Sequence, residues 1–131
     1  METVVINPWT WQDGLGFVQA REVSGAERVV YCAGQSAVDP DGNVLHEGDM
    51  RGQLKRSLDN GETVLAEAGL GLADVVRLNC YTTDVDAFFE SYDAVTSRLA
   101  EAGARVSSTL LGITRLAQPA LLVEIEATAA A

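Results

Sequence analysis

Cationic side chains are scarce in this sequence. Nine Lys and Arg residues stand against nineteen Asp and Glu, so the formal net charge is −10, and the single histidine is His46. Non-specific binding of nucleic acids depends on Lys and Arg residues that neutralise phosphates, so this charge balance disfavours a nucleic-acid partner. His46 lies beside a turn and is expected to be solvated. Both observations argue against a ribonuclease.

Long apolar runs are absent as well. No stretch approaches the roughly 18 apolar residues of a membrane span. The N-terminus also lacks the basic and apolar segments of a signal peptide. We therefore expect a cytoplasmic protein with no membrane partner.

Cysteines are few, and catalytic signatures are missing. Cys32 and Cys80 lie in apolar, β-like segments without C-x-x-C spacing. We expect both to be reduced, buried thiols rather than disulfide partners or metal ligands. There is no P-loop, no H-E-x-x-H, no G-x-S-x-G, and no Cys/His grouping at metal spacing. The sequence therefore predicts no metal site.

The composition is that of a globular domain, with 47% hydrophobic and 21% charged residues. A chain of 131 residues can form one core and is too short for two ordinary domains. We expect a single domain over residues 1–131.

Six segments have the length and composition of β-strands. They are Thr3–Ile6, Phe17–Val23, Val29–Ala33, Val75–Thr82, Thr109–Ile113 and Leu121–Ala127. The short linker Ser24–Glu27 predicts that the second and third form a hairpin. Alternation in the fourth predicts Val76 on the face of Cys80, with Val75 on the opposite face. In the last segment, Glu124 and Glu126 are expected to share one face.

Two longer segments have helical periodicity and capping residues. The first is expected to begin after Asp49 and to stop at Gly69, and the second to extend from Asp84 to Gly103. Apolar residues recur at helical spacing in both. In the second segment, the residues expected to form one buried stripe are Val85, Phe88, Phe89, Tyr92, Val95, Thr96 and Leu99. Gly61 lies inside the first helix, where close approach to a sheet would explain a glycine.

This order of elements predicts an α+β fold, with a roughly six-stranded sheet and two helices packed on one face. The other face would expose apolar side chains such as Val29, Tyr31 and Val123, which predicts closed, symmetric oligomerisation through it. Trp9 and Trp11 either close an open end of the sheet, the commoner arrangement, or line a ligand site.

Several motifs occur in an order that resembles the Rid family, also called the YjgF or liver perchloric-acid-soluble protein family. They are A-G-Q at Ala33–Gln35, D-P-D-G-N at Asp39–Asn43, Q-L-K-R-S-L-D-N at Gln53–Asn60, E-A-G-L at Glu67–Leu70, V-V-R-L-N-C-Y-T-T-D-V at Val75–Val85 and L-L-V-E-I-E-A at Leu121–Ala127. The resemblance implies a chorismate-mutase-like fold, a homotrimer and ligand sites in the clefts between subunits. It also implies hydrolysis of 2-imino or enamine acids to 2-keto acids and ammonia, without a metal or an organic cofactor.

The resemblance assigns site residues position by position. Glu124 matches the glutamate that places the attacking water, while Gly34 and Gln35 match the turn whose backbone lines the cleft. Phe17 stands where a tyrosine is common, and Ala33 where a serine is common. Tyr92 stands where some members have an asparagine.

One central residue of the deaminating members is replaced. Their arginine binds the substrate carboxylate bidentately, and Ser108 stands at that position here. Ser107 and Thr109 flank it, and Leu110 stands where those members often have a cysteine. Arg105, three residues earlier, would substitute only if the preceding loop bends.

Three functions follow from this pattern. The first is hydrolysis of a small reactive metabolite in the intersubunit cleft, with Glu124 as general base or water positioner. Ordinary 2-imino acids should be poor substrates, and an uncharged imine, enamine or carbamate-like ligand is favoured. The alternative is a non-catalytic module that uses the same cleft to bind a small metabolite or to regulate a partner. An endoribonuclease or translation inhibitor is the least favoured.

Overall fold

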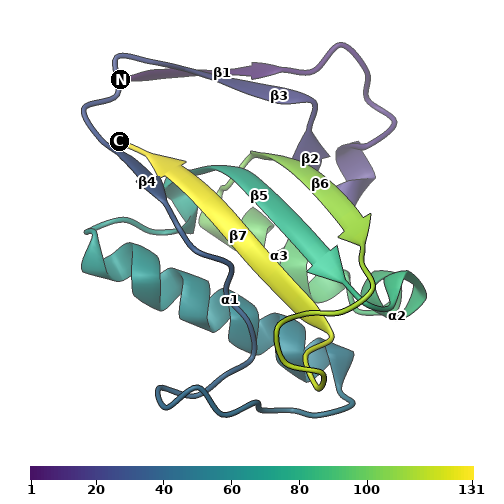
Figure 1. The fold of residues 1–131 in the computed structure, drawn as a ribbon. Coiled ribbons are helices and arrows are strands. Elements are labelled where there is room, and N and C mark those ends of the chain that lie inside the picture. Colours follow the sequence, from purple (N-terminus) through teal and green to yellow (C-terminus); the bar gives the residue numbers. More distant parts are fainter.

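The computed structural model describes residues 1–131 and has a five-stranded mixed sheet in the order β2-β6-β5-β7-β4 (Figure 1). Its strands are β2 (Phe17–Val18), β4 (Val29–Tyr31), β5 (Val75–Thr82), β6 (Val106–Gly112) and β7 (Val123–Ala130). β6 is parallel to β2 and β5, whereas β7 is antiparallel to β5 and β4. A separate two-stranded ribbon pairs β1 (Glu2–Ile6) with β3 (Ala20–Ser24).

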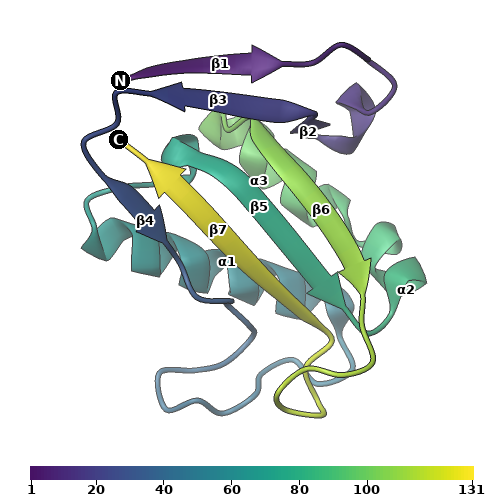
Figure 2. The same ribbon diagram turned by 45° about the horizontal axis from the view of Figure 1, so that its top comes forward.

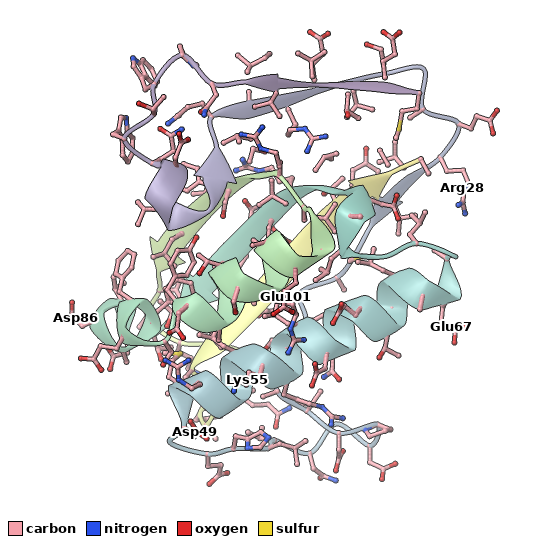
Figure 3. All side chains as sticks on the ribbon, turned by 180° about the vertical axis from the view of Figure 1, so that it is seen from behind. Arg28, Asp49, Lys55, Glu67, Asp86 and Glu101 are labelled. Atoms are coloured by element: carbon pink, nitrogen blue, oxygen red, sulfur yellow. The ribbon has the colours of Figure 1, made fainter.

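All three α-helices lie on one face of the large sheet, and the other face is bare (Figure 2). They are α1 (Met50–Glu67), α2 (Val85–Glu90) and α3 (Asp93–Ala102); the short 3-10 turns are η1 (Asp13–Leu15) and η2 (Leu72–Asp74). Figure 3 views the molecule from the helix side, with Lys55 and Glu67 on α1 and Glu101 on α3. The α+β architecture predicted from the sequence is thus confirmed.

The predicted helix ends are confirmed by their caps. The Asp49 side chain accepts a hydrogen bond from the backbone N–H of Gly52, and Asp84 accepts one from Ala87. Gly69 and Gly103 adopt positive φ values of 74° and 67° immediately beyond α1 and α3. A left-handed residue at this position ends a helix at low steric cost when it is glycine.

The second predicted helix is two helices, because the chain turns at Ser91 and Tyr92 between α2 and α3. α2 has only six residues and buries Phe88 alone. The predicted apolar stripe is therefore wrong at Val85 and Phe89, which are exposed.

The predicted hairpin between Phe17–Val23 and Val29–Ala33 is also wrong. The first segment divides at Gln19: β2 joins β6, while β3 pairs with β1. Gln19 donates its backbone N–H to the Asn7 side chain at 3.3 Å, and its side-chain amide to Gln12 Oε1 at 3.0 Å. The expected six strands consequently form five in one sheet and two in a ribbon.

A register shift in β5 reverses the orientation predicted for its first two residues. The pairing with β7 is irregular between Val75 and Arg77. Val75 is therefore buried with Leu78 and Cys80, and Val76 is only half-buried. An extra residue in one strand shifts the alternation of side chains that precede it.

One residue that the sequence predicted for the bare face lies on the opposite side of the sheet. Val29 and Tyr31 are exposed as predicted, but Val123 is fully buried on the helix side. Val123 belongs to a core that α1, α3 and the covered face of the sheet form together. Its orientation follows from the alternation of β7, where Glu124 and Glu126 take the bare face.

No helix is both long enough and apolar enough to cross a membrane. Both cysteines are free thiols. Burial raises the pKa of Cys80 to about 12 and also raises that of Cys32. A thiol with such a raised pKa carries almost no thiolate near neutral pH and is a weak nucleophile.

Gly61 in α1 is not explained by close packing. A Cβ built on this residue meets no atom within 4 Å. Since glycine in a helix interior costs roughly 0.5–1 kcal/mol relative to alanine, Gly61→Ala should raise the free energy of unfolding by about that amount. Urea denaturation measures it, and a destabilised variant would contradict the open space observed here.

Candidate functional site

An apolar cavity of about 210 Å³ lies between β6, α2 and the loop that precedes β2. It brings together four of the predicted site residues, namely Phe17, Tyr92, Ser108 and Leu110. Five further residues complete the lining: Trp11, Leu15, Cys80, Phe88 and Phe89. The wall is thus largely aromatic, and it contains no charged side chain.

The loop that carries Trp11 is held in place by polar contacts. The fully buried Gln12 side chain donates to the Trp9 carbonyl at 2.9 Å and to the Asn7 side chain at 2.5 Å. On the other side of the cavity, the Tyr92 hydroxyl donates to the Leu15 carbonyl at 2.6 Å. The Gln12 bonds hold the loop together, and the Tyr92 bond attaches it to the start of α3.

Trp11 does not close the end of the sheet, the arrangement that the sequence favoured. It is 69% exposed at the rim of the cavity and packs edge-on against Phe17, with ring centroids 6.2 Å apart. Trp9 is also exposed. Trp11 lines a pocket instead, which was the less favoured of the two predicted arrangements.

Sequence reasoning did not assign Leu15, Cys80, Phe88 or Phe89 to a site. One signal was present, because the apolar stripe around Phe88 and Phe89 was wider than a single buried helix face requires. Phe89 is the excess residue, and it points to the cavity rim with 52% of its surface exposed.

Glu124 lies at a different place, against the segment that follows β4. A Cβ built on Gly34 would be 1.8 Å from Glu124 Oε1, so only glycine leaves room for this carboxylate. Gln35 and Ile125 exchange two backbone hydrogen bonds of 2.7 and 2.9 Å, which hold the two segments together. Ala33 is exposed beside them, and its carbonyl accepts a hydrogen bond from the Gln35 side chain.

Glu124 and Glu126 share a face of β7, as predicted, but differ in their partners. Glu126 accepts hydrogen bonds from the Tyr81 hydroxyl and, at 3.1 Å, from Asn79 Nδ2. The bond from Tyr81 is the main cause that lowers the pKa of Glu126, and it raises the pKa of Tyr81. Glu124 forms none of the salt bridges in the chain. Of these two carboxylates, only Glu126 is bonded to neighbouring side chains.

Within one copy of the chain, Glu124 and Ser108 lie on opposite faces of the sheet. Tyr81 in β5 is paired with Glu124, whereas the preceding residue, Cys80, is paired with Leu110. Successive residues of a strand point to opposite faces. The cavity of Ser108 and Leu110 therefore opens on the helix side, and Glu124 lies on the bare side.

The remaining predicted residues lie apart from the cavity. Arg105 lines a neighbouring cavity of about 180 Å³ that shares Phe17 with the first one. Ser107 and Thr109 are on the bare face, where Arg77 Nη2 donates to the Thr109 hydroxyl at 2.7 Å. Neither arginine forms an ion pair with Glu124. No group of three or more His, Cys, Asp or Glu side chains has a geometry that could hold a metal ion.

Comparisons with known proteins extend over most of the chain. A family model described as "Endoribonuclease L-PSP" matches residues 16–131. A RutC family protein of Pyrococcus abyssi is 33% identical over 100 residues, which cover 76% of each chain. The structure of YyfB from Yersinia pestis, described as a Rid family protein of unknown function, has a TM-score of 0.85 and 34% identity and covers all of both chains. E. coli TdcF with bound serine has a TM-score of 0.72 and 26% identity, over 88% of this chain and 87% of TdcF.

Proposed function

This chain belongs to the endoribonuclease L-PSP family, also called the YjgF or Rid family, and on that premise we propose that it hydrolyses the C=N bond of a small reactive imine or enamine. The site would be a cleft between subunits of a homotrimer. Glu124 of one subunit would face the apolar cavity of its neighbour. No metal or organic cofactor would take part.

The proposal rests on the state of the Glu124 carboxylate. It lies against the Gly34 backbone and has no ion-pair partner, whereas Glu126 is bonded to Tyr81 and Asn79. A carboxylate without a permanent partner can accept a proton from water, which is what a general base requires.

The reaction can be written with these groups. Glu124 takes one proton from a water molecule while the water oxygen bonds to the imine carbon, and the imine nitrogen takes a proton from solvent. In the resulting carbinolamine the amino nitrogen takes the proton back from Glu124 and the C–N bond breaks with its electrons going to nitrogen. The hydroxyl proton passes to solvent, which leaves ammonia and a carbonyl product. An enamine would first be protonated at carbon to give the imine.

The separation of Glu124 from the cavity supports a site shared between subunits. Two groups on opposite faces of one sheet can act on one molecule only when another copy supplies one of them. The bare face also exposes Tyr31 and Leu111, and association of three sheets around a central barrel would cover them. The relative TdcF was solved with bound serine, which supports a site for a small molecule.

The lining of the cavity argues against ordinary 2-imino acids. Their carboxylate needs a cationic partner, because a charged group removed from water without one is destabilised. Ser108 stands in the cavity without an arginine, and Arg105 lines the adjacent cavity beyond Phe17. Uncharged imines or enamines are therefore the proposed substrates.

The test compares Glu124→Gln with wild type and with Glu126→Gln as a matched control on the same strand face. Imines are generated in situ by an amine oxidase that releases the imine, acting on amines that carry no carboxylate, and ammonia release is followed. We expect wild type and Glu126→Gln to accelerate release, and Glu124→Gln to fall to the buffer rate. Equal rates for wild type and Glu124→Gln would contradict the hydrolase proposal.

A non-catalytic binding module is the second candidate, and one observation favours it. No titratable group of the cavity is suited to proton transfer near neutral pH, because burial raises the pKa values of both Tyr92 and Cys80 to about 12. If Glu124 of a neighbour does not reach the cavity, a ligand would bind and be recovered unchanged. An endoribonuclease is disfavoured by the net charge of −10.

A further inference from the structure

We propose that the cavity lined by Trp11, Phe17, Phe88, Phe89, Tyr92 and Ser108 binds a flat, uncharged aromatic group, and that this group is part of the substrate. The inference deepens the proposed function and rests on it for the identity of the site. It names the chemical class of the ligand, which the reaction type alone leaves open.

Aromatic rings from two parts of the chain line the cavity. The ring centroids of Phe88 and Phe89 are 6.0 Å apart, and Tyr92 lies 5.3 Å from Phe88 and 6.2 Å from Phe89. Trp11 and Phe17, in edge contact, come from the loop and β2. Aromatic rings attract one another at centroid distances of about 4.5–7 Å. A flat ring inserted between the two groups would meet such partners on both sides.

The cavity measures about 210 Å³. An apolar cavity of about 150 Å³ is known to accommodate benzene. The space therefore suits one substituted ring.

Eight of the nine lining residues are hydrophobic, and the ninth is Ser108. The Tyr92 hydroxyl is already bonded to the Leu15 carbonyl, and burial raises the Tyr92 pKa to about 12. A carboxylate or ammonium group placed here would lose its hydration without gaining an opposite charge.

Ser108 supplies the one polar contact for the ligand. Its neighbours are engaged on the bare face, where the Ser107 hydroxyl donates to the Val76 carbonyl and Thr109 accepts from Arg77. Ser108 points to the cavity instead, where its hydroxyl can donate or accept one hydrogen bond. A neutral carbonyl, amide or imine next to the ring would be its partner.

The experiment measures binding, not turnover, with a matched pair of probes. Benzamide and benzoate have the same shape and differ in charge, and pyruvate carries a carboxylate without a ring. Binding is measured by calorimetry on the full chain carrying Glu124→Gln. We expect benzamide to bind at least about tenfold more tightly than benzoate, and pyruvate not to bind.

Two variants locate the binding. Ser108→Arg should reverse the preference toward benzoate by about tenfold to a hundredfold, because a guanidinium forms a charge-assisted pair with the carboxylate. Thr114→Arg adds the same charge on the exposed connector after β6 and should leave the preference unchanged. Trp11→Ala alters an exposed rim residue and should weaken benzamide binding several-fold without loss of folding.

The outcomes separate this inference from the proposed function. Benzamide binding without Glu124-dependent ammonia release from any imine supports the aromatic site and rejects the hydrolase. Glu124-dependent hydrolysis together with equal or tighter binding of benzoate rejects the aromatic, uncharged ligand and keeps the hydrolase. Absence of benzamide binding also rejects the inference.

Discussion

Gly34→Ala is expected to reduce imine hydrolysis by about 100-fold and to destabilise the fold. The new methyl carbon would lie 1.8 Å from Glu124 Oε1 and 2.5 Å from its Cδ. The carboxylate must therefore move by more than about 1 Å, and a displacement of that size can cost on the order of 100-fold in rate. Overpacking of this kind typically costs about 1–3 kcal/mol in stability.

A double-mutant cycle isolates the contact. In a Glu124→Ala background the carboxylate is absent, so the same Gly34→Ala change should cost little in the free energy of unfolding. The coupling between the two positions should then be about 1–3 kcal/mol, as measured by chemical denaturation. Equal destabilisation by Gly34→Ala in both backgrounds would mean that Glu124 is not held against this backbone.

Phe88→Ala should lower the free energy of unfolding by about 3–5 kcal/mol, because it removes a large side chain from the core. Phe88 is 1% exposed, belongs to the main core cluster and also forms part of the aromatic cavity. The enlarged cavity should also weaken binding of a ring-shaped ligand.

Phe89→Ala is the matched control for this change. Phe89 has the same chemistry, is adjacent in α2 and lines the same cavity, but it is 52% exposed. Its replacement should cost less than about 1 kcal/mol, in line with the small effect of surface substitutions. Urea denaturation at equal protein concentration compares the free energies of unfolding of the two variants. If Phe88→Ala and Phe89→Ala lose similar amounts, the two side chains do not differ in burial as described here.

Features that depend on neighbours in sequence were predictable. The caps of Asp49 and Asp84 and the stops at Gly69 and Gly103 are confirmed, because each depends on backbone groups within three or four residues. Strand β5 and the shared face of Glu124 and Glu126 follow from local composition and period-2 alternation.

The sequence alone did not predict how segments far apart in the chain pair with one another. Phe17–Val23 divides at Gln19 because Asn7 and Gln12 bond to that residue, a contact that strand propensity does not encode. The burial of Val75 in place of Val76 follows from a register shift against β7. Phe88 and Phe89 are the same residue type, and only the packing of α2 decides which of them faces the core.

The sequence by itself determined the family and the α+β class, because these reside in residue identity and short-range order. That Ser108 stands at the position of the deaminating arginine stays a prediction from the resemblance. Only the tertiary structure decided which of two adjacent carboxylates is free. Glu126 is bonded to Tyr81, 45 residues away, whereas Glu124 lies against Gly34. The structure also placed Glu124 and Ser108 on opposite faces of one sheet. That separation depends on the registers of β5 with β6 and β7, which hydrogen bonding across the sheet sets and local sequence does not.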